Sequence, residues 1–377
     1  MKDKFKSWTY KQQYKYKSFL PENINKNFYW DNKKINILLE KANLELWKLE
    51  SFSKFIPDIN FFISMHISKE AIQSSKIEWT KTEFDDLFAK DTSYKTLEER
   101  NDLIEVQNYI RALNLWMEQL KDLPLSFRLF CNIHKELLSW VRWEHKNPWE
   151  IRKSQNWIWG SSLNDAFFIP PHQDDLPDLI NDFEKFLHND NLEIPELIKI
   201  SIAHYQFETI HPYLDWNGRI WRLMIILYLI EKNIISSPIL YISDFLEKNR
   251  WSYYDALTIA REQNNIELFI IFMLNWIIET CKNSISTLEN VLRLKKISEK
   301  KLISFWKRIE KAQNILNYLY SNPVVNYKDI MNLLNISSPT TANKFIDEFI
   351  KIWILEQKTL NKRNKEYIFE NYLSLFR

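Results

Sequence analysis

Glycine is almost absent from this chain, which has 2 glycines and 16 tryptophans among 377 residues. Glycine makes up about 7% of an average protein, because turns, helix ends and phosphate loops need a residue that lacks Cβ and tolerates positive φ. We therefore hypothesise that many of these tryptophans are glycines in the natural protein, encoded by UGA in a genome that reads this codon as glycine. The alternative is a genuinely tryptophan-rich protein. The positions concerned are Trp79, Trp140, Trp143, Trp149, Trp159, Trp216, Trp221 and Trp353.

Other scarcities exclude whole classes of protein. Two cysteines, Cys131 and Cys281, are too few for a disulfide framework or a zinc cluster. The longest apolar run, Leu223 to Ile230, is too short to span a bilayer, and the first residues lack the apolar stretch of a secretory signal. The net charge of +2 marks no global nucleic-acid or membrane binding. We expect a cytoplasmic protein without a membrane partner.

Helical spacing of apolar residues runs through most of the chain and predicts a mainly α fold. Pro195 opens one such segment at a position that helices tolerate. Residues 220–230 are apolar almost all round, as in the buried centre of a bundle. In contrast, residues 156–171 break the helical period around two prolines and predict a short β-hairpin flap.

The last segments predict a separate unit. Residues 329–335 and 342–352 read as two short helices and residues 365–369 as a strand, the order of a winged helix. We predict four regions: an N-terminal helical region over 1–100, a helical core over 101–285, a helical connector over 286–310 and a small α+β winged-helix domain over 311–377.

The loop from His211 to Arg222 concentrates chemistry within twelve residues. Free N–H groups at the start of a helix attract anions, and Gly218 there permits a phosphate to approach the backbone. Arg219 offers a forked cationic donor, and Arg222 projects from the same helical face. Asp215 is a hard oxygen ligand suited to Mg²⁺, and His211 can accept a proton near neutral pH. Together they predict phosphoryl or nucleotidyl transfer.

Each residue of this loop also has an ordinary structural explanation. A histidine before proline often caps a helix, and Asp-x-Asn-Gly is often only a turn. A zinc site is a further alternative, since His204, Glu208 and His211 fall on one helical face.

The loop His-Pro-Tyr-Leu-Asp-Trp-Asn-Gly-Arg-Ile-Trp-Arg over 211–222 resembles the signature His-Pro-Phe-x-Asp-Gly-Asn-Gly-Arg-x-x-Arg of the Fic (filamentation induced by cAMP) family. It departs at Tyr213 and at Trp216, where the family has glycine. Upstream, residues 148–160 resemble the family's run into the flap, with Trp149 and Trp159 in place of glycine. The segment Ser74-Ser-Lys-Ile-Glu-Trp79 is similar to the family's inhibitory motif, again with tryptophan for glycine.

The resemblance implies a Fic-type helical bundle that transfers AMP from ATP to a Tyr, Thr or Ser hydroxyl of a target protein. It implies that His211 is the base, that Asp215 holds Mg²⁺, and that Ser74 and Glu78 restrain Arg222, which would otherwise take the γ-phosphate. The implied nucleotide-binding residues are Asp215, Trp216, Asn217, Gly218, Arg219, Arg222, Tyr253 and Tyr254. The implied flap that docks an extended target is Ala166, Phe167, Phe168 and Ile169.

Other functions compete with this one. The same fold could remove AMP or transfer another phosphate-containing group. A different class is a DNA-binding regulator that acts through the winged helix. Its second helix carries one lysine against Asp347 and Glu348, which favours protein contact or a homodimer over DNA. The cations that keep DNA in consideration are Lys358, Lys362, Arg363 and Lys365.

Overall fold

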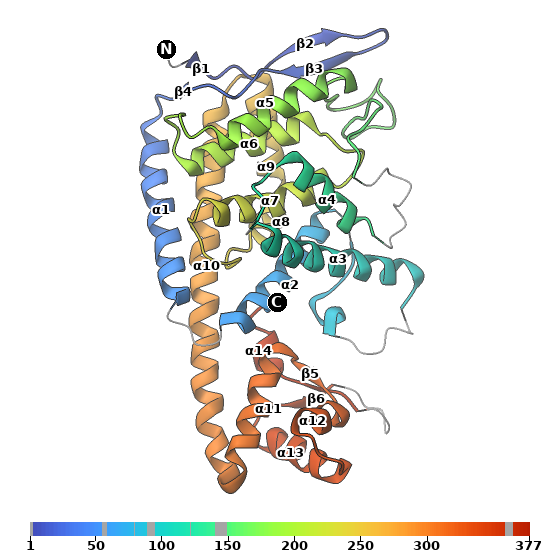
Figure 1. Ribbon diagram of the computed structural model, residues 1–377, viewed down its shortest axis with the longest axis vertical. Helices are drawn as coiled ribbons and strands as arrows, with labels where there is room; N and C mark the ends of the chain where they lie inside the picture. The colour runs from blue at the N-terminus through green and yellow to red at the C-terminus, as the bar shows by residue number, and fades with distance from the viewer. Residues whose placement is uncertain are drawn as a thin grey trace.

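The computed structural model describes residues 3–54, 59–78, 80–88, 95–120, 122–139, 149–358 and 365–377. It confirms a mainly helical fold with small sheets, and 65% of the described residues are helical (Figure 1). Several of the positions singled out in the sequence lie outside the described residues, namely Trp79, Trp140, Trp143, Lys362 and Arg363.

The elements follow one another from a mixed N-terminal segment into a helical body and a small C-terminal lobe. The helices are α1 (Lys33–Lys54), α2 (Ile59–Ile77), η1 (Phe84–Phe88), α3 (Leu97–Gln119), α4 (Phe127–Leu137), η2 (Gln173–Asp175), α5 (Leu176–His188), α6 (Glu196–Ile210), α7 (Asn217–Glu231), α8 (Ser243–Lys248), α9 (Arg250–Glu262), α10 (Ile266–Lys301), η3 (Leu302–Arg308), α11 (Ile309–Ser321), α12 (Tyr327–Leu334), α13 (Pro339–Lys351) and α14 (Glu370–Leu373). The strands are β1 (Asp3–Lys4), β2 (Trp8–Gln12), β3 (Lys17–Pro21), β4 (Phe28–Tyr29), β5 (Val324–Val325), β6 (Glu356–Gln357) and β7 (Tyr367–Ile368).

The N-terminal segment differs from the predicted helical region, because residues 3–29 carry four strands before α1 begins. Strands β2 and β3 pair antiparallel from Trp8↔Pro21 to Gln12↔Lys17. Phe19 of β3 is buried, and its N–H donates to the carbonyl of Ile169 at 3.0 Å. The β2–β3 hairpin therefore packs against the predicted flap.

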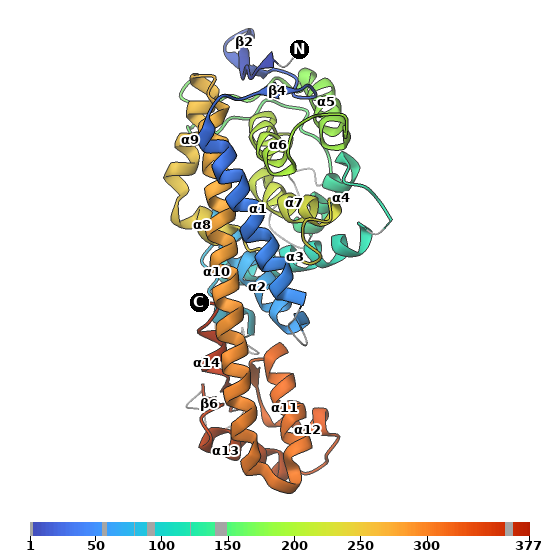
Figure 2. The same ribbon diagram turned by 90° about the vertical axis from the view of Figure 1, so that its left-hand side faces the viewer.

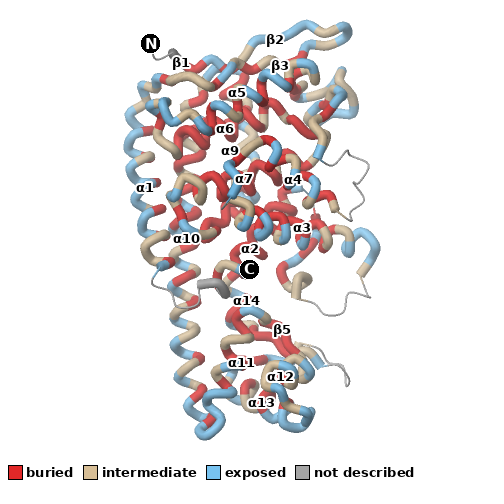
Figure 3. Tube along the Cα trace, in the orientation of Figure 1, coloured by how far each residue is buried: buried red, intermediate tan, exposed pale blue. Residues whose placement is uncertain are grey.

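Helices α6 and α7 form the centre of the body, where nearly every side chain is buried (Figure 3). This confirms the prediction for residues 220–230. Helix α10 packs along α1 (Figure 2). By length and composition alone, one helical stretch among the described residues, Ile266–Ser321, could cross a membrane, but 56% of its apolar window is buried, as in the core helix of a globular protein.

The C-terminal lobe consists of α11 to α13 and an antiparallel sheet in the order β5-β7-β6. Asn326 caps α12 in a reciprocal capping box with Asp329. Ser338 caps α13, whose first residue is Pro339. The elements follow in the order α11, β5, α12, α13, β6 and β7, so strands and helices alternate in this lobe. The winged-helix domain over 311–377 stays a prediction.

Candidate active site

Helix α6 ends at His211, whose left-handed backbone (φ 48°, ψ 62°) turns the chain into the loop. Arg152 is buried beneath this turn. Its Nε donates to the carbonyl of His211 at 2.9 Å and its Nη2 to those of Pro171 at 2.6 Å and Ile210 at 3.3 Å. A planar guanidinium can satisfy several carbonyls at once, so Arg152 fixes where the His211 imidazole stands.

The loop is closed by Asn217. Its Oδ1 accepts from the N–H of Tyr213, and its Nδ2 donates to the carbonyl of Tyr213, both at 2.9 Å. Both polar atoms of the Asn217 side chain are thus used within the loop, which leaves the backbone N–H of Asn217 as its group for a phosphate. Asn156, from the segment before the flap, donates to the same Tyr213 carbonyl at 3.1 Å.

Trp216 occupies the N-cap of α7 in a left-handed conformation (φ 69°, ψ 8°). The guanidinium of Arg219 lies 3.7 Å from the centroid of its ring, and Arg219 Nη1 contacts Glu105 Oε2 of α3 at 2.8 Å. Arg219 and Glu105 are both buried. Arg219 is thus held by α3, and it does not line the cavity beside Arg222. By contrast, Trp221 is helical and fully buried against Phe207.

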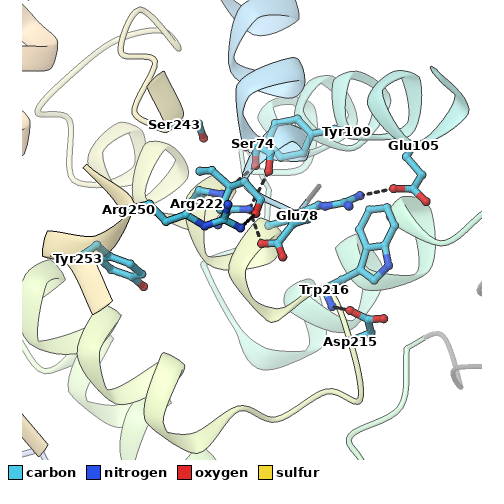
Figure 4. Close-up of polar contacts among 12 residues, drawn as sticks. Ser74, Glu78, Glu105, Tyr109, Asp215, Trp216, Arg222, Ser243, Arg250 and Tyr253 are labelled. Carbon is cyan, nitrogen blue, oxygen red and sulfur yellow. Dashed lines mark hydrogen bonds and ion pairs between the residues drawn. The ribbon is translucent and has the colours of Figure 1, made fainter. Parts of the chain in front are cut away.

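Arg222 joins α7 to α2 (Figure 4). Its Nε donates to Ser74 Oγ at 2.9 Å, and its Nη2 donates to the Ser74 carbonyl and to Glu78 Oε1, each at 3.0 Å. Burial raises the pKa of Glu78, but Arg222 and Arg219 outweigh it and hold the pKa below its usual range. Burial likewise opposes the charge of Arg222, and Glu78 more than compensates, so the pKa of Arg222 is raised. The pair is a charged contact.

Gly218 makes room for this pair. A Cβ at Gly218 would lie 2.9 Å from Arg222 Nη1 and 2.9 Å from Glu78 Oε1. Any other residue would therefore push these two groups aside.

A cavity of about 190 Å³ opens beside the Arg222–Glu78 pair. It brings together α2, the flap, α6, the loop and α9. Its lining residues are Ile77, Glu78, Ile158, Trp159, Phe167, Glu208, His211, Asp215, Trp216, Asn217, Gly218, Arg222, Leu246, Arg250, Tyr253, Tyr254, Leu257, Thr258 and Arg261. Ligand cavities usually measure roughly 300–1,000 Å³, and the Glu78 side chain and the indoles of Trp159 and Trp216 narrow this one.

Two titratable groups in the cavity are strongly shifted. Burial, helped by Arg152 and Arg261, lowers the pKa of His211 to about 3, so the imidazole is neutral at pH 7. Burial raises the pKa of Glu208 to about 7 against the opposing charges of Arg222 and Arg261. Shifted pairs of this kind are concentrated at functional sites.

The flap is a short hairpin, as predicted. Ile158 and Phe168 exchange backbone hydrogen bonds of 2.9 and 3.2 Å. Phe167 is exposed and lines the cavity, whereas Phe168 packs inward beneath Arg261. Ala166 and Ile169 flank these two rings and are partly buried.

Tyr253 and Tyr254 both line the cavity, which is where a nucleotide-binding role would place them. The Tyr253 hydroxyl lies 2.8 Å from Nε2 of His204.

Among the described residues, no three His, Cys, Asp or Glu side chains are grouped to hold a metal ion. The zinc alternative, which needed His204, is therefore wrong.

Asp215 stands at the cavity with its Oδ1 accepting from the N–H of Trp216 at 2.8 Å. One carboxylate together with nucleotide phosphates is the usual protein site for Mg²⁺. The donor set fits a magnesium ion brought by a nucleotide.

Several residues of the site were missed by sequence reasoning. Arg152 lies 59 residues before its partner His211, and Glu105 lies 114 residues before its partner Arg219. Arg250 and Arg261 bring two further cations to the cavity from the ends of α9. In the sequence, the segment that contains Arg152 shows only a family resemblance, and no local signal marks Glu105.

Comparison with known proteins agrees with this geometry. Residues 124–229 match the model of the Fic/DOC family, and residues 37–118 match the Fic/DOC family N-terminal model. The chain is 27% identical over 183 residues to protein adenylyltransferase Fic of Aedes aegypti, which is 48% of this chain and 33% of that protein. It is 28% identical over 202 residues to a probable protein adenylyltransferase of Aquifex aeolicus, 53% of this chain and 57% of that one.

The chain therefore spans about a third to little more than half of these relatives' lengths. Two solved structures show the same fold. A Fic family protein from Desulfovibrio desulfuricans G20 superposes with a TM-score of 0.58 at 18% identity, over 90% of this chain and 97% of that one. A Fic domain containing signaling protein from Bacteroides thetaiotaomicron superposes with a TM-score of 0.52 at 16% identity, over 67% and 95%.

Proposed function

Because residues 37–118 and 124–229 match the two Fic/DOC family models, we propose that this chain is a Fic/DOC family protein and transfers AMP from ATP to a hydroxyl of a target protein. The observation that carries this proposal is the single cavity that His211, Asp215 and Arg222 line together. It offers a neutral imidazole, a carboxylate and a guanidinium at the start of a helix, the groups that nucleotidyl transfer needs.

In the proposed reaction, the His211 imidazole accepts the proton of the acceptor hydroxyl as its oxygen bonds to the α-phosphorus of ATP. The bond from that phosphorus to the bridging oxygen breaks, and pyrophosphate leaves with the electron pair. Asp215 would hold Mg²⁺, which would supply positive charge to neutralise the phosphates. The N–H groups of residues 217 and 218 receive phosphate oxygens at the start of α7.

We further propose that Glu78 restrains this activity. Arg222 is the cation placed to receive the γ-phosphate, and Glu78 and Ser74 occupy its donors. A nucleotide that enters beside the intact pair meets a carboxylate instead of a free guanidinium and is held in a non-productive pose. Exposed flap residues, above all Phe167, stand where an extended target segment could add as a strand.

The position of the label separates AMP transfer from phosphate transfer. The E78G variant is incubated with Mg²⁺ and ATP labelled at either the α- or the γ-phosphorus, in a W216G background because the Trp216 indole lines the cavity. We expect the protein to acquire the α-label and not the γ-label. Transfer of the γ-label would instead establish phosphate transfer, and transfer of neither label would refute the proposal.

A further inference from the structure

Phe376 connects the C-terminal lobe to the segment that carries Ser74 and Glu78. Its ring is 1% exposed. The ring centroid lies 6.2 Å from that of Phe62 and 5.4 Å from that of His66, both on α2. It also lies 6.3 Å from the ring of Phe84 on η1, and these two rings are nearly parallel. Phe376 therefore touches the chain both before and after the inhibitory residues.

Arg377 makes a second, polar connection to the same place. Its Nη2 and Nε donate to Asp85 Oδ1 of η1 at 2.6 and 3.1 Å, and its Nη2 also donates to Glu370 of α14 at 3.1 Å. Figure 1 shows this end of the chain beside α2, above the C-terminal lobe. An exposed ion pair contributes little by itself, so the buried Phe376 ring is the main contact and Arg377 aligns it.

The segment that carries Ser74 and Glu78 runs between these contacts. Ser74 lies on the same unbroken helix as Phe62, about 18 Å further along at 1.5 Å per residue. Glu78 follows the last turn of that helix, and the chain then returns to Phe84 under the Phe376 ring. A cavity of about 250 Å³ lies between α2, η1 and the last two residues of the chain.

We infer that Phe376 and Arg377 are positioning residues that hold Glu78 against Arg222. The C-terminal lobe thereby sets the activity of the distant site: whatever draws residues 376 and 377 away from α2 and η1 loosens the Glu78–Arg222 contact. This inference rests on the proposed function, in which that contact restrains AMP transfer.

The test measures the rate of self-labelling and asks whether the effect of each substitution requires Glu78. F376A and R377A are compared with their parent for self-labelling from α-labelled ATP, in the W216G background. We expect F376A to raise the rate several-fold and R377A to raise it by a smaller factor. F376L should keep the parent rate, and neither F376A nor R377A should add to E78G. The matched control is R308A, which breaks an ion pair with Glu348 inside the lobe, away from α2. A rise that persists in the E78G background would overturn the inference.

Hydrogen exchange provides a readout that needs no catalysis. Amides of residues 70–78 should exchange faster in F376A and R377A than in the parent, and not in R308A. If E78G itself transfers no AMP, the proposed function fails, while the exchange rates still test the contacts of Phe376 and Arg377. Unchanged exchange in both folded variants would overturn the positioning role; should F376A fail to fold, R377A decides.

A second inference comes from the backbone alone. Nine non-glycine residues among the described ones have positive φ. Three are asparagines and one is His211, and asparagine tolerates this conformation because its short side chain can bond locally. The other five are all tryptophans, a residue type that lacks this capacity: Trp149, Trp159, Trp216, Trp306 and Trp353.

Two of these positions adopt backbone geometries in which glycine is the preferred residue. Trp306 has φ 47° and ψ −115°, the geometry of the first central residue of a type II′ turn, which glycine dominates. Trp353 follows the C-cap of α13, and the N–H of Ile354 returns to the carbonyl of Phe349 at 3.0 Å, as in a helix end that closes on glycine. Trp306 and Trp353 are 77% and 73% exposed, so no burial of the indole offsets the strain.

We infer that the natural protein carries glycine at positions 149, 159, 216, 306 and 353, encoded by UGA. Trp276 is the contrasting case, because it is helical and buried and its Nε1 donates to the carbonyl of Ile242 at 2.8 Å. Glycine at 216 removes an indole from the cavity and leaves bare backbone at the start of α7, where a phosphate would approach.

Peptide mass spectrometry of the protein from its source cells tests this inference. We expect glycine at the five positions and tryptophan at 276, with UGA and UGG codons respectively. In protein made with the sequence as it stands, W306G and W353G should raise the melting temperature and W276G should lower it. Tryptophan in the natural peptide at 306 or 353 would overturn the inference.

Discussion

The Nε atom of Arg152 donates to the backbone carbonyl of His211 at 2.9 Å, although 59 residues separate them. This bond places a buried cation beneath the residue that we propose as the base. The turn at His211 has left-handed φ, and such turns persist only where the surroundings fix them. The precision of the site therefore depends on a residue outside the loop itself.

Replacing Arg152 should destabilise the protein and misplace the loop. R152A leaves the carbonyls of Ile210, His211 and Pro171 without their donor, which should lower the free energy of unfolding by about 2–4 kcal/mol. R152K keeps the positive charge but lacks the planar, multi-donor guanidinium, so we expect a smaller loss of unfolding free energy than in R152A. Urea denaturation measures both, and a lysine variant as stable as its parent would contradict the role of the guanidinium.

Replacing His211 should remove the base. In the E78G and W216G background, H211A should lower the initial rate of AMP incorporation by about 10²-fold or more. H172A is a suitable control because His172 does not line the cavity. Equal rates for H211A and H172A would exclude His211 as the base.

Asp215 should set the magnesium requirement. In the same background, D215N replaces the carboxylate with a neutral amide and should raise the half-saturating Mg²⁺ concentration about 10-fold or more. D174N, from outside the cavity, serves as the control. The measurement is the AMP-transfer rate across a Mg²⁺ titration, and an unshifted curve for D215N would show that the ion is held elsewhere.

Glu208 should make stability depend on pH. Its pKa is raised from 4.5 to about 7 in the folded protein, so its contribution to stability is fully present below about pH 4.5 and is lost as pH rises through 7. The neutral amide side chain of the E208Q variant does not ionise, so its free energy of unfolding does not fall in this way. Relative to the parent, E208Q should therefore become more stable as pH rises, by up to about 3 kcal/mol at pH 8. Unfolding free energies at pH 4.5 and pH 8 test this, with the exposed Glu262 replaced as E262Q for comparison. An equal gain at both pH values would contradict it.

The sequence predicts the parts of this site that lie close together along the chain. Residues 211–222 form one loop and helix start, so their chemistry follows from residue types and spacing alone. The contact of Arg222 with Ser74 and Glu78, more than 140 residues apart, was expected only through the resemblance. Local patterns do not encode pairs such as Arg219 with Glu105, because only tertiary packing brings α3 and α7 together.

Two differences have simple physical causes. Sequence reasoning did not foresee that the side-chain amide of Asn217 closes the loop on Tyr213, where it both accepts and donates a hydrogen bond. Sequence reasoning missed the hairpin of β2 and β3, in which β2 is mostly exposed and buries no face of its own. Its register is set by Phe19 packing on the flap, which is a tertiary contact.

The most direct test of the central claim compares AMP incorporation in the W216G parent and in its E78G variant. Both are incubated with ATP and Mg²⁺ and followed by intact-protein mass spectrometry. We predict that the parent gains little mass, that E78G gains whole AMP units at least about 10-fold faster, and that adding H211A abolishes the gain. Equal rates in the parent and in E78G would contradict the claim that Glu78 restrains Arg222.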